Sequence, residues 1–122
     1  MPNDGKPMAR PARNKAERIT AGVMIFSATC QACHQADGKG IPSAFPPLLA
    51  SDYLNADPKR AVTAITKGLS GKITVNGKDY DGVMPQQNLS DEQVANVVTY
   101  VLNNFGNKGG EFTPAQVATL RK

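Results

Sequence analysis

Two cysteines and the only histidine of the chain stand close together near residue 30. Cys30, Cys33 and His34 form the pattern C-x-x-C-H, which is the attachment pattern of a c-type haem. At this spacing each thiol can form a thioether with one vinyl group of the porphyrin, and the adjacent histidine is carried beneath the ring, where it can bind iron. We therefore predict one covalently bound haem c, with Cys30 and Cys33 as its thioether residues and His34 as an iron ligand.

Other uses of two cysteines fit this chain poorly. A thioredoxin-type C-x-x-C is expected beside a βαβ pattern, which the sequence lacks. A tetrahedral zinc site needs four ligands, so carboxylates would have to complete a set that has only two cysteines and one histidine. A disulfide between Cys30 and Cys33 would leave His34 without a role. Haem attachment is the interpretation that uses all three residues.

The second axial ligand of the iron must come from elsewhere, and the methionines are its candidates. Met1 and Met8 lie in the opening segment, and Met24 stands six residues before Cys30, where a core or surface role is favoured. Met84 lies 50 residues after His34, in what we expect to be a loop before the last helix, and the following proline favours an extended conformation. Met84 is the predicted ligand, with Met24 as the alternative.

Length and composition indicate one globular domain with additional tail residues. The chain has 122 residues, 40% hydrophobic and 20% charged, and no apolar run approaches the roughly 20 residues of a membrane span. Its opening residues have no apolar core and do not resemble a signal peptide. Because covalent haem attachment normally takes place outside the cytoplasm, we expect a periplasmic or otherwise extracytoplasmic bacterial location, with the targeting signal absent from this chain.

The positive charge of the chain is concentrated at its ends. The net charge is +4, but the first 18 residues sum to +3 and the last two add +2, which leaves −1 for the body. No aromatic residues are interleaved with these cations, as a nucleic-acid surface would favour. We therefore expect no nucleic-acid partner.

Helical patterns stand at both ends of the predicted domain. The first helix is expected to begin at Asn14, with Glu17 completing a capping box, and its apolar side is predicted to consist of Ile19, Gly22, Val23, Phe26 and Cys30. The last long helix is expected to follow a Ser90–Gln93 capping box and to end at Gly106. Its apolar stripe is Val94, Val97, Val98, Val101, Leu102 and Phe105.

Shorter elements are expected between and after these helices. Asp57 and Pro58 mark the start of a helix that ends at Gly68, and Asn76-Gly77 predicts a hairpin turn within residues 73–80. A short helix is expected after Thr113-Pro114. We divide the chain into a flexible basic linker (1–13), a domain (14–107) and a C-terminal extension with a short helix (108–122).

The motifs together resemble those of class I, monohaem cytochromes c, over roughly residues 18–107. The matching pieces are Gly22 and Phe26, Cys30 to His34, Asp37 to Gly40, Phe45 to Leu48, Met84-Pro85, and Val97 with Tyr100. The resemblance implies a small all-α cytochrome c fold, with the N- and C-terminal helices packed orthogonally around one haem, plus a short β-hairpin. Residues 40–53 and 73–85 are also similar to bacterial cytochrome domains associated with copper nitrite reductases or haem-copper oxidases.

The same resemblance implies roles for residues around the haem. The carbonyl of Pro46 would accept the Nδ1–H of His34 and leave Nε2 free for iron; Pro47 is the alternative. The family often has a tryptophan near a haem propionate, whereas this chain has no tryptophan. Tyr80 and Lys72 could donate hydrogen bonds to the propionates instead, or could simply be exposed.

A haem with both axial positions filled suits an electron carrier better than an enzyme. Histidine and methionine ligation leaves no open position for a substrate and favours a high potential. We expect one-electron transfer between redox proteins of respiration or denitrification, such as copper nitrite reductase, haem-copper oxidase or a periplasmic dehydrogenase. A free-standing chain is expected to be monomeric. The alternatives are a haem domain of a larger redox enzyme, such as a fused nitrite reductase, and a ligand-binding or peroxidase-like haem protein.

Overall fold

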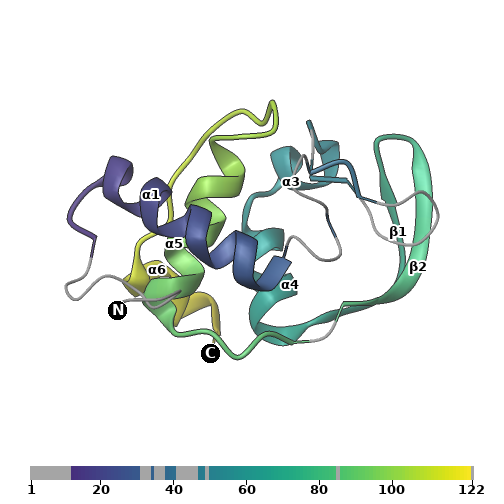
Figure 1. Ribbon diagram of the computed structural model, residues 1–122. Coiled ribbons are helices and arrows are strands. Elements are labelled where there is room, and N and C mark those ends of the chain that lie inside the picture. Colours follow the sequence, from purple (N-terminus) through teal and green to yellow (C-terminus); the bar gives the residue numbers. More distant parts are fainter. Residues whose placement is uncertain are drawn as a thin grey trace.

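The first and last long helices of the domain cross at the centre of the molecule (Figure 1). The computed structural model describes residues 12–30, 34, 38–40, 47–48, 50–84 and 86–121. In chain order its elements are α1 (Lys15–Ile25), a π-helical turn (Phe26–Cys30), α3 (Asp52–Ala56), α4 (Lys59–Lys67), β1 (Leu69–Val75), β2 (Lys78–Met84), α5 (Asp91–Leu102) and α6 (Pro114–Arg121). The fold is the expected mostly helical one with a short hairpin. Within the described ranges, no helix is both long and apolar enough to cross a membrane.

The crossing of α1 over α5 depends on Gly22. A methyl group at this position would overlap the carbonyl oxygen of Asn96 and lie 2.6 Å from Cβ of Tyr100. Only a residue without Cβ allows the two helix backbones to approach so closely. Gly22, which was predicted on the apolar side of the first helix, is therefore buried against α5.

The buried face of α1 differs from the predicted one. Ala21, Gly22 and Ile25 are buried together with Arg18, whereas Val23 is 41% exposed, so its predicted core position is wrong. Our prediction considered only apolar residues and thus missed Arg18. Its guanidinium Nε lies 3.0 Å from a carboxylate oxygen of Glu111, and such pairing is what allows a charged side chain to be buried.

The N-termini of α1 and α5 have the predicted caps, whereas α5 ends at Leu102 and not, as predicted, at Gly106. The side chain of Asn14 accepts the N–H of Glu17, whose own carboxylate accepts the N–H of Arg13 rather than forming the expected box with Asn14. At α5 the box is complete, because Ser90 and Gln93 each accept the other's backbone N–H. The predicted apolar stripe of α5 is buried throughout.

The segment between these helices contains one predicted helix and one that we did not expect. In α4 the carboxylate of Asp57 accepts the N–H of Lys59, and the helix ends at Gly68 with φ 78°. The unexpected helix is α3, where the Ser51 hydroxyl accepts the N–H of Leu54 and caps a five-residue helix. Helices this short carry little periodicity in sequence, which is why the pattern did not reveal it.

The hairpin is longer than predicted. Asn76 and Gly77 have φ values of 52° and 81°, as a two-residue turn of type I′ requires. Pairing continues outward from this turn to Leu69 opposite Met84. Met84 is therefore the last residue of a strand and not, as the sequence suggested, part of a loop.

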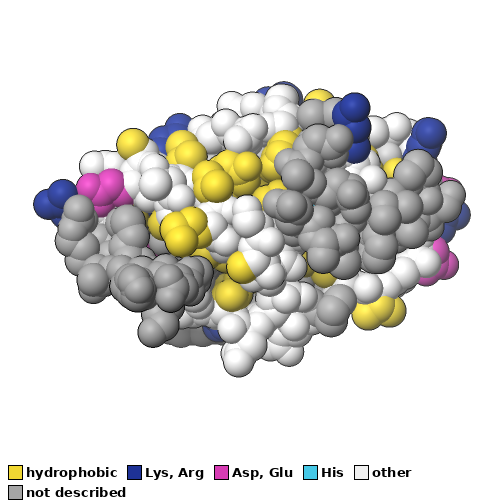
Figure 2. Space-filling model, viewed as in Figure 1, with side chains coloured by type: hydrophobic (Ala, Val, Ile, Leu, Met, Phe, Trp, Pro, Cys, Tyr) yellow, Lys and Arg dark blue, Asp and Glu magenta, His cyan; other side chains and the backbone are white. Residues whose placement is uncertain are grey.

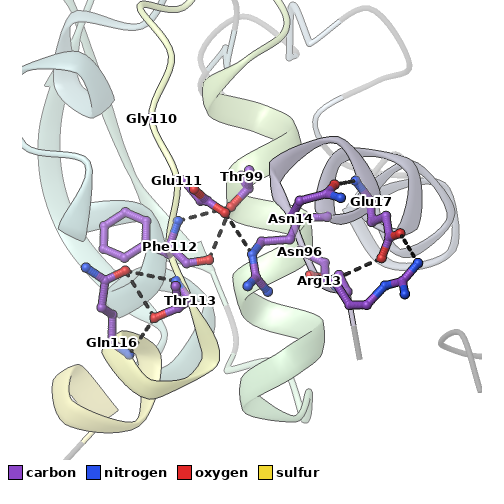
Figure 3. Close-up of polar contacts among 12 residues, drawn as sticks. Arg13, Asn14, Glu17, Asn96, Thr99, Gly110, Glu111, Phe112, Thr113 and Gln116 are labelled. Atoms are coloured by element: carbon purple, nitrogen blue, oxygen red, sulfur yellow. Dashed lines mark hydrogen bonds and ion pairs between the residues drawn. The ribbon is translucent and has the colours of Figure 1, made fainter. Parts of the chain in front are cut away.

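The C-terminal segment packs on the same core as α5. Phe112 and Val117 are buried, and the Thr99 hydroxyl of α5 accepts the N–H of Phe112 at 3.1 Å. Figure 3 shows Thr99, Glu111 and Phe112 gathered where this segment passes α5. The division of the chain at residue 107 remains a prediction, but residues on both sides of it contribute to one cluster of buried side chains.

Candidate haem-binding site

A large cavity lies between α4, the hairpin and α5. The space within it is about 660 Å³, part of which is open to solvent. Most of its wall is apolar. The hairpin contributes Leu69, Ile73 and Val75, and α5 contributes Val97, Val98 and Val101.

Three of the predicted site residues line this one cavity. Cys30 reaches it from the π-helical turn that continues α1, and Met84 reaches it from the end of β2. His34 also lines it and is 9% exposed, with its carbonyl accepting the N–H of Gly40 at 3.0 Å. Residues 50 positions apart in sequence are thus brought to the same space. Cys33 and Pro46 lie outside the described residues, whereas Pro47, the alternative to Pro46, lines the cavity.

Neither of the two predicted propionate contacts, Lys72 and Tyr80, lines the cavity itself. Side chains alternate between the faces of a strand, and Lys72 belongs to the face opposite the cavity-lining Ile73. Its ammonium lies 3.3 Å from the carboxylate of Asp79, and the Thr74 hydroxyl and then this ammonium hold the pKa of Asp79 below its ordinary value. Tyr80 is buried and is paired with the cavity-lining Ile73, so it lies on the same face of the hairpin without lining the cavity itself. The structure does not bring either residue to the cavity wall.

Arg60 is a cavity residue that sequence reasoning missed. It is the only charged side chain among the described residues that line the cavity. It lies on α4 at the helical spacing i−4 from Ala64, which also lines the cavity, as do Ala61 and Ile65. This helical spacing could have shown that Arg60 lies on the same side of α4 as the apolar residues. Our prediction did not use it, because it considered only apolar residues as candidates for that side.

Asn107 connects the cavity wall to the end of α5 and was also missed. Its amide nitrogen donates to the carbonyls of Leu48 and Val101, each at 2.9 Å. Its amide oxygen accepts the N–H of Ser51 and a side-chain N–H of Asn55. An amide side chain has two N–H donors and two acceptor lone pairs, so the hydrogen-bonding capacity of the Asn107 side chain is fully satisfied.

Substitution of Asn107 should destabilise the part of the cavity wall to which its side chain is hydrogen-bonded. We expect Asn107→Ala to lower the free energy of unfolding of the holoprotein by about 2–3 kcal/mol, because several partly buried partners lose their hydrogen bonds. Asn104→Ala is the control, since the Asn104 side chain is exposed and, among the described residues, accepts only the neighbouring N–H of Phe105. Denaturant titration measures both, and equal losses in the two variants would contradict this role of Asn107.

The cavity suits a flat, largely apolar ring with a metal at its centre. Its apolar walls match the porphyrin, and the thiol, imidazole and thioether that reach it are the groups that attach a c-type haem and bind its iron. A helical domain with such a cavity, entered by the histidine of a C-x-x-C-H motif, is that of a c-type haem protein.

Comparison with known proteins identifies the family. The sequence model of the family described as cytochrome c matches residues 19–105. Cytochrome c-552 of Thermus thermophilus is 38% identical over 110 residues, which cover 82% of this chain and 83% of that protein. The chain belongs to the cytochrome c family, and it transfers electrons by means of one covalently attached c-type haem.

Two other relatives differ in how much of their length the chain covers. Cytochrome c6 of Gracilaria tenuistipitata var. liui is 38% identical over 94 residues, covering 75% of this chain and 78% of that protein. The fructose dehydrogenase cytochrome subunit of Gluconobacter japonicus is 31% identical over 122 residues, covering 93% of this chain but 24% of that subunit. The chain is thus similar both to small cytochromes and to a part of a larger subunit.

Proposed function

We propose that this protein carries single electrons on a haem attached through Cys30 and Cys33, with His34 and Met84 as the axial ligands of the iron. The observation that supports this proposal is the arrival of Cys30, His34 and Met84 at one apolar cavity from separate parts of the chain. Bound haem supplies an iron that alternates between the ferrous and ferric states. His34 and Met84 would occupy both of its free coordination positions, which favours a carrier over an enzyme.

The residues around the cavity would set the potential and keep the ligands in place. The soft thioether of Met84 favours ferrous iron, and apolar walls disfavour the additional charge of ferric iron, so both raise the potential. The backbone of Met84 is paired with Leu69 in the hairpin. This pairing restrains the ligand during the redox cycle and limits the rearrangement that each electron transfer requires.

Substitution of Met84 tests the ligation. We expect Met84→Ala to lose the weak sulfur-to-iron charge-transfer band of the ferric protein, to have a lower potential, and to bind carbon monoxide in the ferrous state. Met24→Ala is the matched control, because Met24 is 45% exposed on α1 and does not line the cavity. An unchanged band in Met84→Ala, or its loss in Met24→Ala, would assign the ligand elsewhere.

We further propose that the partners are redox proteins outside the cytoplasm, with a dehydrogenase of the kind to which the larger relatives belong as the first candidate. Copper nitrite reductase and haem-copper oxidase are the alternatives. Val83, next to Met84, is 74% exposed and offers an apolar contact to a partner. Figure 2 shows further apolar side chains reaching the surface along the line of α1, where Val23 and Met24 are exposed.

The charged residues of the hairpin near Val83 predict how the rate of association with a redox partner depends on ionic strength. On the hairpin, Lys72 and Lys78 balance Asp79 and Asp81, so this surface gives little long-range steering. We expect the rate of electron transfer to the true partner to change little with ionic strength. Stopped-flow mixing of the holoprotein with each candidate partner measures this rate, and a steep fall with salt would show that other, charged residues form the contact.

A further inference from the structure

We propose that Arg60, held in place by Tyr53, binds a propionate group of the haem. This inference rests on the proposed function, because it requires the haem in the cavity described above. It assigns a carboxylate-binding residue to α4 and so defines which side of the cavity receives the charged edge of the ring.

The chemistry of the cavity wall calls for such a residue. A haem has two carboxylate side chains, and an ionised carboxylate is strongly disfavoured against apolar walls unless it meets water or a cation. Among the described lining residues, only Arg60 carries a charge. Arg60 is also an exposed residue, which places it where the cavity meets solvent.

Contacts with Tyr53 hold the Arg60 side chain in position. The guanidinium carbon lies 4.4 Å from the centre of the Tyr53 ring, and Nη1 donates to the Tyr53 carbonyl at 2.9 Å. Tyr53 lies on α3 and also lines the cavity. Two contacts of different kinds therefore restrict the rotation of a long side chain, and the carboxylate would meet a group that is already ordered.

Arg60 keeps donors available for a carboxylate. A guanidinium has five N–H donors, and in the part of the chain that the structure describes its side chain donates one hydrogen bond and forms no ion pair. The planar arrangement of the remaining N–H groups suits a carboxylate, which can accept two parallel hydrogen bonds. Arg60 is thus a charged, oriented residue at an apolar cavity, without an acidic protein partner among the described residues.

The test compares Arg60→Gln with Lys59→Gln in the holoprotein. Lys59 is the adjacent exposed cation on α4 and does not line the cavity, so its substitution removes the same charge without the proposed contact. We expect Arg60→Gln to move the propionate bending band in the resonance Raman spectrum to lower frequency and to lower the reduction potential more than Lys59→Gln does. Arg60→Lys should restore both properties at least in part, because it keeps a cation that can donate.

The possible results separate this inference from the proposed ligation. A propionate band unmoved in Arg60→Gln, or moved equally in Lys59→Gln, would overturn the role of Arg60 even if the wild-type protein shows the methionine charge-transfer band. Absence of that band from the wild-type protein would refute Met84 ligation, whatever the propionate band shows. Tyr53→Leu should shift the propionate band in the same direction as Arg60→Gln, because the ring no longer holds the guanidinium; an unmoved band would exclude Tyr53 as a positioning residue.

Discussion

The double variant Cys30→Ala/Cys33→Ala is expected to carry no covalent haem and to lose its cooperative thermal transition. The cavity of about 660 Å³ lies between α4, the hairpin and α5, so the haem completes the core between them. Without the haem, the apolar side chains that line this space lose the group they would pack against, and unfilled space inside a core is destabilising. Without haem, we expect these elements not to keep their native arrangement.

Intact mass and circular dichroism measure this result. The denatured wild-type holoprotein should retain the mass of one haem, whereas the double variant should have the mass of the polypeptide alone. The single variant Cys30→Ala is the control for the substitution itself, since Cys33 can still form one thioether. Extraction of haem from the wild-type protein by acidified organic solvent would exclude covalent attachment, and a cooperative melt of the double variant would show that the haem is not needed for folding.

Gly22→Val is the second substitution with a large expected effect. Its side chain would have to occupy the space where α1 meets the Asn96 carbonyl and the Tyr100 side chain, so the two helices would have to move apart. Overpacking typically costs about 1–3 kcal/mol and occasionally more, and here the atoms in the way include backbone. We expect the free energy of unfolding to fall by about 3 kcal/mol, despite the higher helix propensity of valine.

Ala16→Val provides the matched control for this prediction. Ala16 is an exposed residue of the same helix, so the substitution introduces the same β-branched side chain, although it adds one carbon fewer than at Gly22, at a position without a facing helix. It should cost less than about 1 kcal/mol, mainly through helix propensity. Chemical denaturation of both holoproteins compares them. Similar losses at positions 16 and 22 would mean that the α1–α5 contact tolerates a side chain after all.

Features encoded by neighbouring residues were predicted from the sequence. The caps at Asn14 and Ser90 and the Asn76-Gly77 turn depend on residues at most three positions apart, and each forms at its expected place. Met84 was predicted as an iron ligand from its position downstream of the C-x-x-C-H motif and before a proline, and it lines the cavity. Such features depend on local backbone geometry, which the order of residues records directly.

Features that depend on distant contacts were not predicted. Asn107 forms hydrogen bonds with Leu48, Ser51 and Asn55, which are more than 50 positions away in sequence. Arg60 lines the cavity because α4 packs beside the hairpin and α5, an arrangement that the local sequence does not record. The face of the hairpin that lines the cavity was not predicted either, because one position along a strand reverses the face; Lys72 lies on the face opposite the cavity-lining Ile73. Val23 was wrongly predicted to be buried. The buried side of α1 includes Arg18 instead, whose charge is paired with Glu111, a residue far along the chain.

The contact of Gly22 with Asn96 has a consequence for the order of events during biosynthesis. These residues are 74 positions apart, so α1 cannot find its partner until almost the whole domain has been synthesised. Closing so long a loop is slow relative to local helix formation. We therefore expect the thiol of Cys30 to stay accessible until α5 packs on α1, so haem attachment should precede the closure of this contact.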